Sequence, residues 1–65
     1  MRLDGTKLKI AMAEHSMNVK DLSEVTGLTA TTISKARSGK KVSGETAVKI
    51  AFALSMKAAD LLKAE

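Results

Sequence analysis

The 65-residue sequence contains no cysteine and no proline, and its only aromatic side chain is that of Phe52. Without cysteine the chain can form no disulfide, and it has neither a thiolate ligand for zinc nor a thiol nucleophile. Alanine, leucine and lysine are abundant instead. These residues favour helices, whereas the scarcity of aromatic residues disfavours a sheet. The composition therefore predicts an all-α protein.

Catalytic groups are also scarce. The only histidine is His15, and a lone imidazole without cysteines or clustered carboxylates can build neither a metal site nor a catalytic triad. The sequence shows no pair of carboxylates, no nucleophile beside a base and no phosphate-binding loop. We therefore expect no enzymatic activity, no metal, no cofactor and no small-molecule ligand.

Long hydrophobic runs are missing as well. The longest uncharged apolar run covers residues 50–56, far fewer than the ~20 residues that a membrane helix needs. Charged residues interrupt the first fifteen positions, so this segment lacks the apolar centre of a signal peptide. A chain of this length has room for one small core. We expect a single domain over residues 1–65, located in the cytoplasm.

Hydrophobic periodicity and capping residues predict five helices, over residues 6–15, 19–26, 30–37, 44–54 and 58–64. Asn18, Thr29 and Ser43 are the expected N-caps, because their short polar side chains can accept hydrogen bonds from the first amides of a helix. Gly27 is expected to end the second helix in the left-handed conformation that other residues resist. Only a very short turn then separates the second helix from the third.

The helix over residues 44–54 is apolar on nearly all sides, and we expect it to be the central element of the core. The second helix is expected to bury Leu22 and Val25. We expect the core to centre on six large side chains: Leu8, Leu22, Ile33, Ile50, Phe52 and Leu54.

The positive charge is unevenly distributed. Lys35, Arg37, Lys40 and Lys41 lie within residues 27–41 without any acidic residue, and their charge of +4 equals the formal net charge of the chain. The acidic and basic residues elsewhere cancel. Such a local positive charge indicates a polyanionic partner, although a solvated basic loop gives the same count.

The third helix is expected to have two different faces. Ile33 and Ala36 fall on its inner side. Its outer stripe consists of short polar side chains and one cation: Thr31, Ser34, Lys35 and Ser38. A merely solvated helix usually carries long acidic and basic pairs, so this stripe indicates close approach to a partner. A helix, a short turn with glycine and such a second helix are the elements of a DNA-binding helix-turn-helix.

The chain resembles the Cro and phage-repressor helix-turn-helix family in the runs NVKDLSEVTG and LTATTISKARSGKK and in the later segment SGETAVKIAFALSMKAADLL. The match extends from Leu8 to Leu62. It implies a compact, five-helix, lambda-repressor-like domain whose third helix enters the major groove of DNA. The resemblance implies base contacts by Ala30, Thr31, Ser34 and Lys35. Phosphate contacts are expected from the backbone amide of Asn18 and from Thr29, Ser38, Lys40 and Lys41.

The chain departs from this family pattern in four respects. Val19 stands where many relatives have a glutamine that touches DNA. Met12 and Arg37 stand where many relatives have an ion pair between the first and third helices. Ser55 replaces the usual glycine after the fourth helix, and Lys57 replaces the usual cap of the fifth. These departures concern local geometry and individual contacts rather than the fold, because apolar packing can replace a buried ion pair.

We predict a sequence-specific transcriptional regulator that binds double-stranded DNA, most similar to a Cro-like repressor. We expect it to form a weak homodimer that is strengthened on a pseudo-palindromic operator, with an interface at Met56, Ala59, Leu61 and Leu62. The alternative is a small helical protein-interaction module, adaptor or antitoxin-like, whose basic patch docks an acidic partner. The salt dependence of duplex binding distinguishes the two, because only a DNA binder releases counterions from the duplex.

Overall fold

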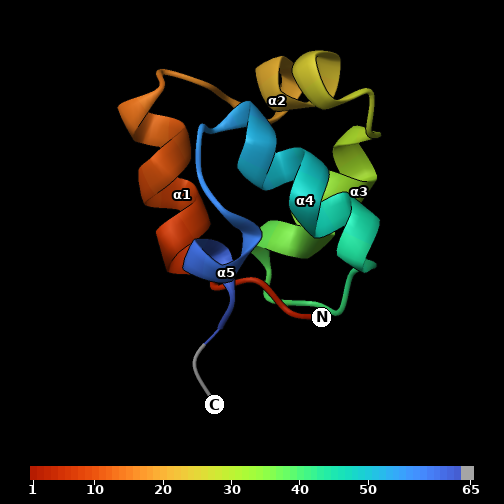
Figure 1. Ribbon diagram of the computed structural model, residues 1–65. Helices are drawn as coiled ribbons and strands as arrows, with labels where there is room; N and C mark the ends of the chain where they lie inside the picture. Colours follow the sequence, from red (N-terminus) through yellow and green to blue (C-terminus); the bar gives the residue numbers. More distant parts are fainter. Residues whose placement is uncertain (64–65) are drawn as a thin grey trace.

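The computed structural model describes residues 1–63, which form five helices around one hydrophobic core (Figure 1). The helices are α1 (Gly5–Glu14), α2 (Val19–Thr26), α3 (Ala30–Arg37), α4 (Gly44–Ala53) and α5 (Ala58–Leu61). The expected all-α, five-helix fold is confirmed, and the bounds of α2 and α3 agree with the expected ranges. Over the described part of the chain, no helix is both long and apolar enough to cross a membrane.

The other three helices differ from expectation at their ends, and α1 and α4 each stop one residue early, at Glu14 and Ala53. α1 begins one residue earlier than expected because the Asp4 carboxylate accepts hydrogen bonds from the amides of Thr6 (2.9 Å) and Lys7 (3.1 Å). α5 ends earlier because the backbone at Leu62 is already extended (φ −67°, ψ 141°). The expected end of that helix, Ala64, lies outside the described residues.

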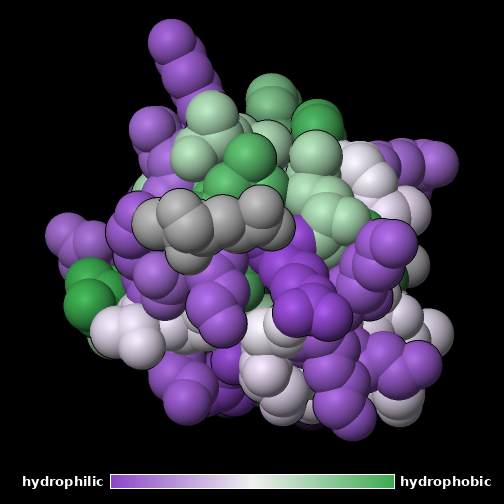
Figure 2. Space-filling view, turned by 90° about the horizontal axis from the view of Figure 1, so that it is seen from below, coloured by the Kyte–Doolittle hydropathy of each residue, from purple (hydrophilic) through white to green (hydrophobic). Residues whose placement is uncertain are grey.

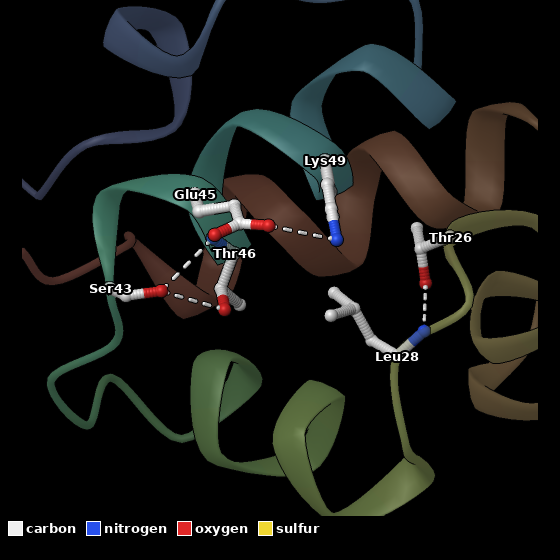
Figure 3. A network of polar contacts seen from close by, with 6 residues as sticks. All are labelled: Thr26, Leu28, Ser43, Glu45, Thr46 and Lys49. Atoms are coloured by element: carbon white, nitrogen blue, oxygen red, sulfur yellow. Dashed lines mark hydrogen bonds and ion pairs between the residues drawn. The ribbon is translucent and has the colours of Figure 1, made fainter.

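The three expected N-caps are confirmed. The side-chain oxygens of Asn18 (2.8 Å), Thr29 (3.2 Å) and Ser43 (3.1 Å) each accept a hydrogen bond from the backbone amide three residues later. Figure 3 shows the bond between Ser43 and the amide of Thr46 at the start of α4. These bonds satisfy amides that a helix leaves unpaired, and they fix where α2, α3 and α4 begin.

Three helices end with the same backbone motif. After α1, α3 and α4 the chain passes through one left-handed residue, which is Ser16 (φ 53°), Gly39 (φ 77°) and Ser55 (φ 55°) respectively. In the last case the amide of Met56 donates to the carbonyl of Ala51 (2.9 Å), the long bond of a Schellman motif. Only one of these positions has the glycine that the left-handed conformation favours.

The core is formed by twelve buried apolar side chains that come from all five helices and from the N-terminal segment. They are Leu3, Leu8, Ala11, Met12, Leu22, Ile33, Ala36, Ala47, Ile50, Ala51, Leu54 and Leu61. Five of the six expected large core residues are among them. Two large members, Leu3 and Leu61, were not expected there.

The expected burial of Phe52 and Val25 is wrong. The side chain of Phe52 is 85% exposed, and Val25 and Val48 are 59% and 56% exposed. Since α4 faces the core with only one side, its buried residues follow a helical repeat, and Val48 and Phe52 point the other way. Within residues 1–63, no further element covers that side. Val25, Val48 and Phe52 together line a shallow hollow, here called the apolar patch.

The segment before α1 lies between two distant parts of the chain. The amide of Val42 donates to the carbonyl of Met1 (2.7 Å), and the amide of Asp4 donates to the carbonyl of Leu61 (2.7 Å). These bonds hold Leu3 inside the core. They also place the N-terminus, the loop after α3 and the end of α5 at the same end of the molecule (Figure 1).

Candidate nucleic-acid interface

The turn between α2 and α3 is held by side chains as well as by glycine. Ser23 donates its hydroxyl hydrogen to the carbonyl of Leu28. The Thr26 hydroxyl donates to the carbonyl of Leu22 (2.7 Å) and accepts from the amide of Leu28 (3.2 Å). Figure 3 shows the bond between Thr26 and Leu28. Gly27 has the expected left-handed backbone (φ 74°). The polar groups of this half-buried turn are therefore paired, which fixes the angle between the two helices.

The third helix has the two faces that its sequence predicts. Ile33 and Ala36 are completely buried against the core. The four proposed base-reading residues all have exposed side chains: Ala30, Thr31, Ser34 and Lys35. Short side chains on an exposed helix face let another surface approach its backbone closely. A B-DNA major groove, which is about 12 Å wide, accepts a helix of this kind.

Most of the expected phosphate-binding residues surround this face. Thr29 lies at the start of α3, and Ser38, Lys40 and Lys41 lie at its end, all with exposed side chains. The amide of Lys40 donates to the carbonyl of Lys35 (3.0 Å), so the basic loop turns directly from the last turn of α3. The structure thus brings these residues together with the outer stripe of the helix.

Asn18 does not present its amide as the resemblance implies. That amide donates to the Asp21 carboxylate (3.1 Å), while the Asn18 side chain accepts from the Asp21 amide (2.8 Å). This reciprocal pair is a capping box, which uses the donor that was assigned to a phosphate. In the free protein the amide is therefore already occupied.

The expected dimer-interface residues are not all on the surface. Leu61 is completely buried within its own chain, where α5 packs on α4, and offers no surface to a second chain. Its assignment to an interface is therefore wrong. Ala59 is exposed, and Met56 and Leu62 are half-buried against the core. These three remain close to one another around α5.

Two cations outside the segment 27–41 lie near the basic loop or α3. The backbone of Arg2 pairs with that of Lys41 in an isolated antiparallel β-bridge, and Lys9 lies beside Ser34 on α3. Figure 2 shows many hydrophilic side chains on the end of the molecule viewed from below, with hydrophobic ones mostly in the upper half of the view and a separate group at the left edge. Sequence reasoning missed Arg2 and Lys9 because neighbouring acids cancel them in a linear count.

Other kinds of site find little support in the described chain. Across residues 1–63, no three histidine or acidic side chains cluster closely enough to hold a metal ion. The single ion pair in that range is exposed and joins Glu45 to Lys49 (3.1 Å) within α4 (Figure 3). The exposed face of α3 and its basic surroundings therefore form the best candidate site.

Comparisons with known proteins agree with this geometry. A family model described as the Cro/C1-type HTH DNA-binding domain matches residues 7–65. The crystal structure of the clp gene regulator ClgR from Corynebacterium glutamicum superposes with a TM-score of 0.73 and 26% sequence identity. That match covers 86% of this chain and 61% of the ClgR chain, so this chain spans about three-fifths of the length of that regulator. A search of curated proteins gave no significant match.

Proposed function

Because the chain belongs to the family of Cro/C1-type HTH DNA-binding domains, we propose that it is a sequence-specific transcriptional regulator, similar to a Cro-like repressor. It inserts α3 into the major groove of double-stranded DNA and acts in the cytoplasm, where bacterial or phage DNA is transcribed. The observation that carries this proposal is the exposed stripe of short polar side chains on α3, directly followed by the basic loop.

Base reading falls to the middle and the start of α3. Lys35 lies on the exposed stripe one turn after Thr31, so its ammonium group can reach the O6 and N7 acceptors of a guanine. Ala30 and Thr31 carry methyl groups that suit the methyl group of a thymine. Ser34 supplies a hydroxyl that can donate to or accept from a base edge.

Phosphate contacts hold the helix in the groove. Thr29, Ser38, Lys40 and Lys41 border the two ends of α3, where the duplex backbone passes if the helix lies in the groove. They bind every sequence alike and orient the domain. Asn18 contributes its backbone amide only if DNA displaces the Asp21 carboxylate from the capping box.

The regulator binds as a pair. One helix of eight residues reads few bases, and a two-fold dimer places two recognition helices about 34 Å apart on one face of a pseudo-palindromic operator. The longest extent of the described chain is 29 Å, so two domains at that spacing come close enough for side-chain contact when their long axes point toward each other. Met56, Ala59 and Leu62 offer a small contact surface, which predicts a weak dimer that is strengthened on DNA.

Sedimentation with and without a palindromic duplex tests the pair. We expect a two-to-one complex on the duplex and mainly monomer without it. Ala59→Glu should abolish the two-to-one complex, because it places a charge in the proposed contact. Phe52→Ser, on the apolar patch, is the control and should leave the complex intact. A reversed result would move the interface to the apolar patch, and a strict one-to-one complex would contradict the pair.

The alternative function is a helical protein-interaction module whose basic surface docks an acidic partner. The exposed apolar patch favours it, because such a patch often marks a protein contact. Selection of bound sites from random duplexes, followed by fluorescence anisotropy over a salt series, separates the two functions. A regulator should enrich one sequence and lose affinity log-linearly with salt. No enrichment and no measurable duplex binding at low salt would favour the interaction module.

A further inference from the structure

A polar hollow lies between the start of α1 and the end of α3. It consists of two adjoining hollows that share Lys9, Arg37 and Ser38, and we call the two together the α1–α3 notch. Asp4 and Lys63 also line the first hollow, and Ser34 lines the second. Neither the base-reading assignments nor the loop lysines include its two central cations, Lys9 and Arg37. The notch adjoins the candidate DNA surface, because Ser34 and Ser38 belong to both.

A close helix contact brings the two cations together. Gly5 packs against the last turn of α3, where an added β-carbon would overlap the carbonyl oxygen of Arg37. Lys9 follows Gly5 by four residues and therefore lies on the same face of α1, one turn further along. The approach of the two helices at Gly5 is thus what carries Lys9 to the side of Ser34 and Arg37.

The notch is positively charged. It contains three cations, those of Lys9, Arg37 and Lys63, and one acid, that of Asp4. The Asp4 carboxylate already accepts hydrogen bonds from the first amides of α1, so it is held at the helix end. Three positive charges and one negative charge leave a net +2 in a hollow that opens beside α3.

Arg37 also has a donor without a partner. Its Nε atom is buried and makes no hydrogen bond within residues 1–63. Over the same range its guanidinium forms no ion pair, and the residue at the other position of the family's ion pair, Met12, is apolar and buried. Buried donors are rarely left unpaired, and a guanidinium is shaped to bind two oxygens of one phosphate. Arg37 as a whole is only partly buried and lines the notch, so an oxyanion there can pair with its guanidinium group.

We propose that the α1–α3 notch is a phosphate site in which Lys9 and Arg37 together bind one phosphodiester of the duplex that α3 reads. The proposal rests on the proposed function and adds α1 to the DNA contact. Arg37 supplies paired N–H donors, Lys9 supplies a point charge, and the Ser38 hydroxyl can donate to the same oxyanion. Free phosphate shares this chemistry, but the position beside α3 favours the DNA backbone.

Anisotropy titrations with Lys9→Ala test the charge. Lys7→Ala is the matched control, since Lys7 is an exposed cation on the same helix that does not line the notch. Lys9→Ala should weaken binding to selected and scrambled duplexes alike, by roughly threefold to tenfold at 0.1 M salt, and lower the salt slope by about one. Lys7→Ala should change neither. Equal effects of the two variants would overturn the proposal.

The Nε–H resonance of Arg37 gives a second readout that does not depend on affinity. It should shift when duplex is added, because a phosphate bound to the same guanidinium changes its electronic surroundings, and inorganic phosphate at millimolar concentration should move it much less. An unchanged resonance in the duplex complex would overturn the site, as would an equal shift with phosphate alone. If wild-type protein binds duplex and Lys35→Ala impairs it, failure of these two tests removes the notch and leaves the proposed function standing.

Discussion

At the ends of α1 and α4, serine residues occupy a backbone conformation that suits glycine better. Ser16 and Ser55 have φ values of 53° and 55°, and both donate their amides within a helix-ending motif. A β-carbon in this region crowds the following carbonyl, which costs about 1–2 kcal/mol relative to the right-handed region. The two serines therefore lower the stability of a small domain that has little to spare.

Ser55→Gly should stabilise the domain. Removing the β-carbon relieves the left-handed strain, and part of that gain is lost to the greater freedom of glycine in the unfolded chain. We expect a gain of roughly 0.5–1 kcal/mol, which raises the melting temperature by about 2–8 °C. Ser38→Gly is the control, because Ser38 has a right-handed φ of −83°. Thermal melting followed by circular dichroism should show Ser38→Gly unchanged or lower, and an equal gain in both variants would refute the strain.

Single residues were predictable from sequence where their chemistry is local. The caps Asn18, Thr29 and Ser43 and the left-handed Gly27 act on amides within three residues, so neighbouring letters are enough to identify them. The role of Gly5 was not predictable in this way. Its missing side chain matters only because the end of α3 packs against it in the folded chain.

At the scale of elements, the orientation of α4 could not be predicted from its sequence pattern. Its position and length were predictable, but a segment that is apolar on nearly all sides does not reveal which side faces the core. The answer depends on how α2 and α5 pack against α4, which leaves Phe52 exposed. The short segment before α1 was likewise missed as a core element, because Leu3 is buried by segments distant in sequence.

Ile50→Ala and Phe52→Ala should separate the two sides of α4. Ile50 is completely buried, and truncating a buried isoleucine costs roughly 2–5 kcal/mol through lost transfer energy and a residual cavity. Phe52 is 85% exposed, so its truncation should change stability by no more than about 0.5 kcal/mol. Urea unfolding measures both. A larger loss for Phe52→Ala than for Ile50→Ala would show that α4 faces the core with its other side.

Gly5→Ala should loosen the contact between α1 and α3. The new methyl group would overlap the carbonyl of Arg37, so the helices must move apart, at a cost of roughly 1–3 kcal/mol. Gly44→Ala is a matched control, because Gly44 is also the first residue of a helix and a β-carbon there would meet no atom closer than 4.0 Å. Urea unfolding should show a loss only for Gly5→Ala, and equal stability of the two variants would contradict the close approach.

For the whole molecule, the sequence predicted the centre of the candidate site, on α3 and the loop after it, but missed cations at its edges. The charge of residues 27–41 and the outer stripe of α3 both come from residues close together in the sequence, so they could be recognised from it. The family match agrees with this assignment. Arg2 and Lys9 join that surface only after folding. Linear counting therefore underestimates the extent of the basic surface.

The central claim is that α3 reads bases while the loop after it holds phosphates. The most direct measurement compares Lys35→Ala and Lys40→Ala by anisotropy on a selected site and on a scrambled duplex. Lys35→Ala should lose roughly 1–3 kcal/mol on the selected site and relax the preference at one base position. Lys40→Ala should weaken both duplexes by the same factor and lower the salt slope by about one. If both variants change selected and scrambled binding by one common factor, Lys35 reads no base and the account is contradicted.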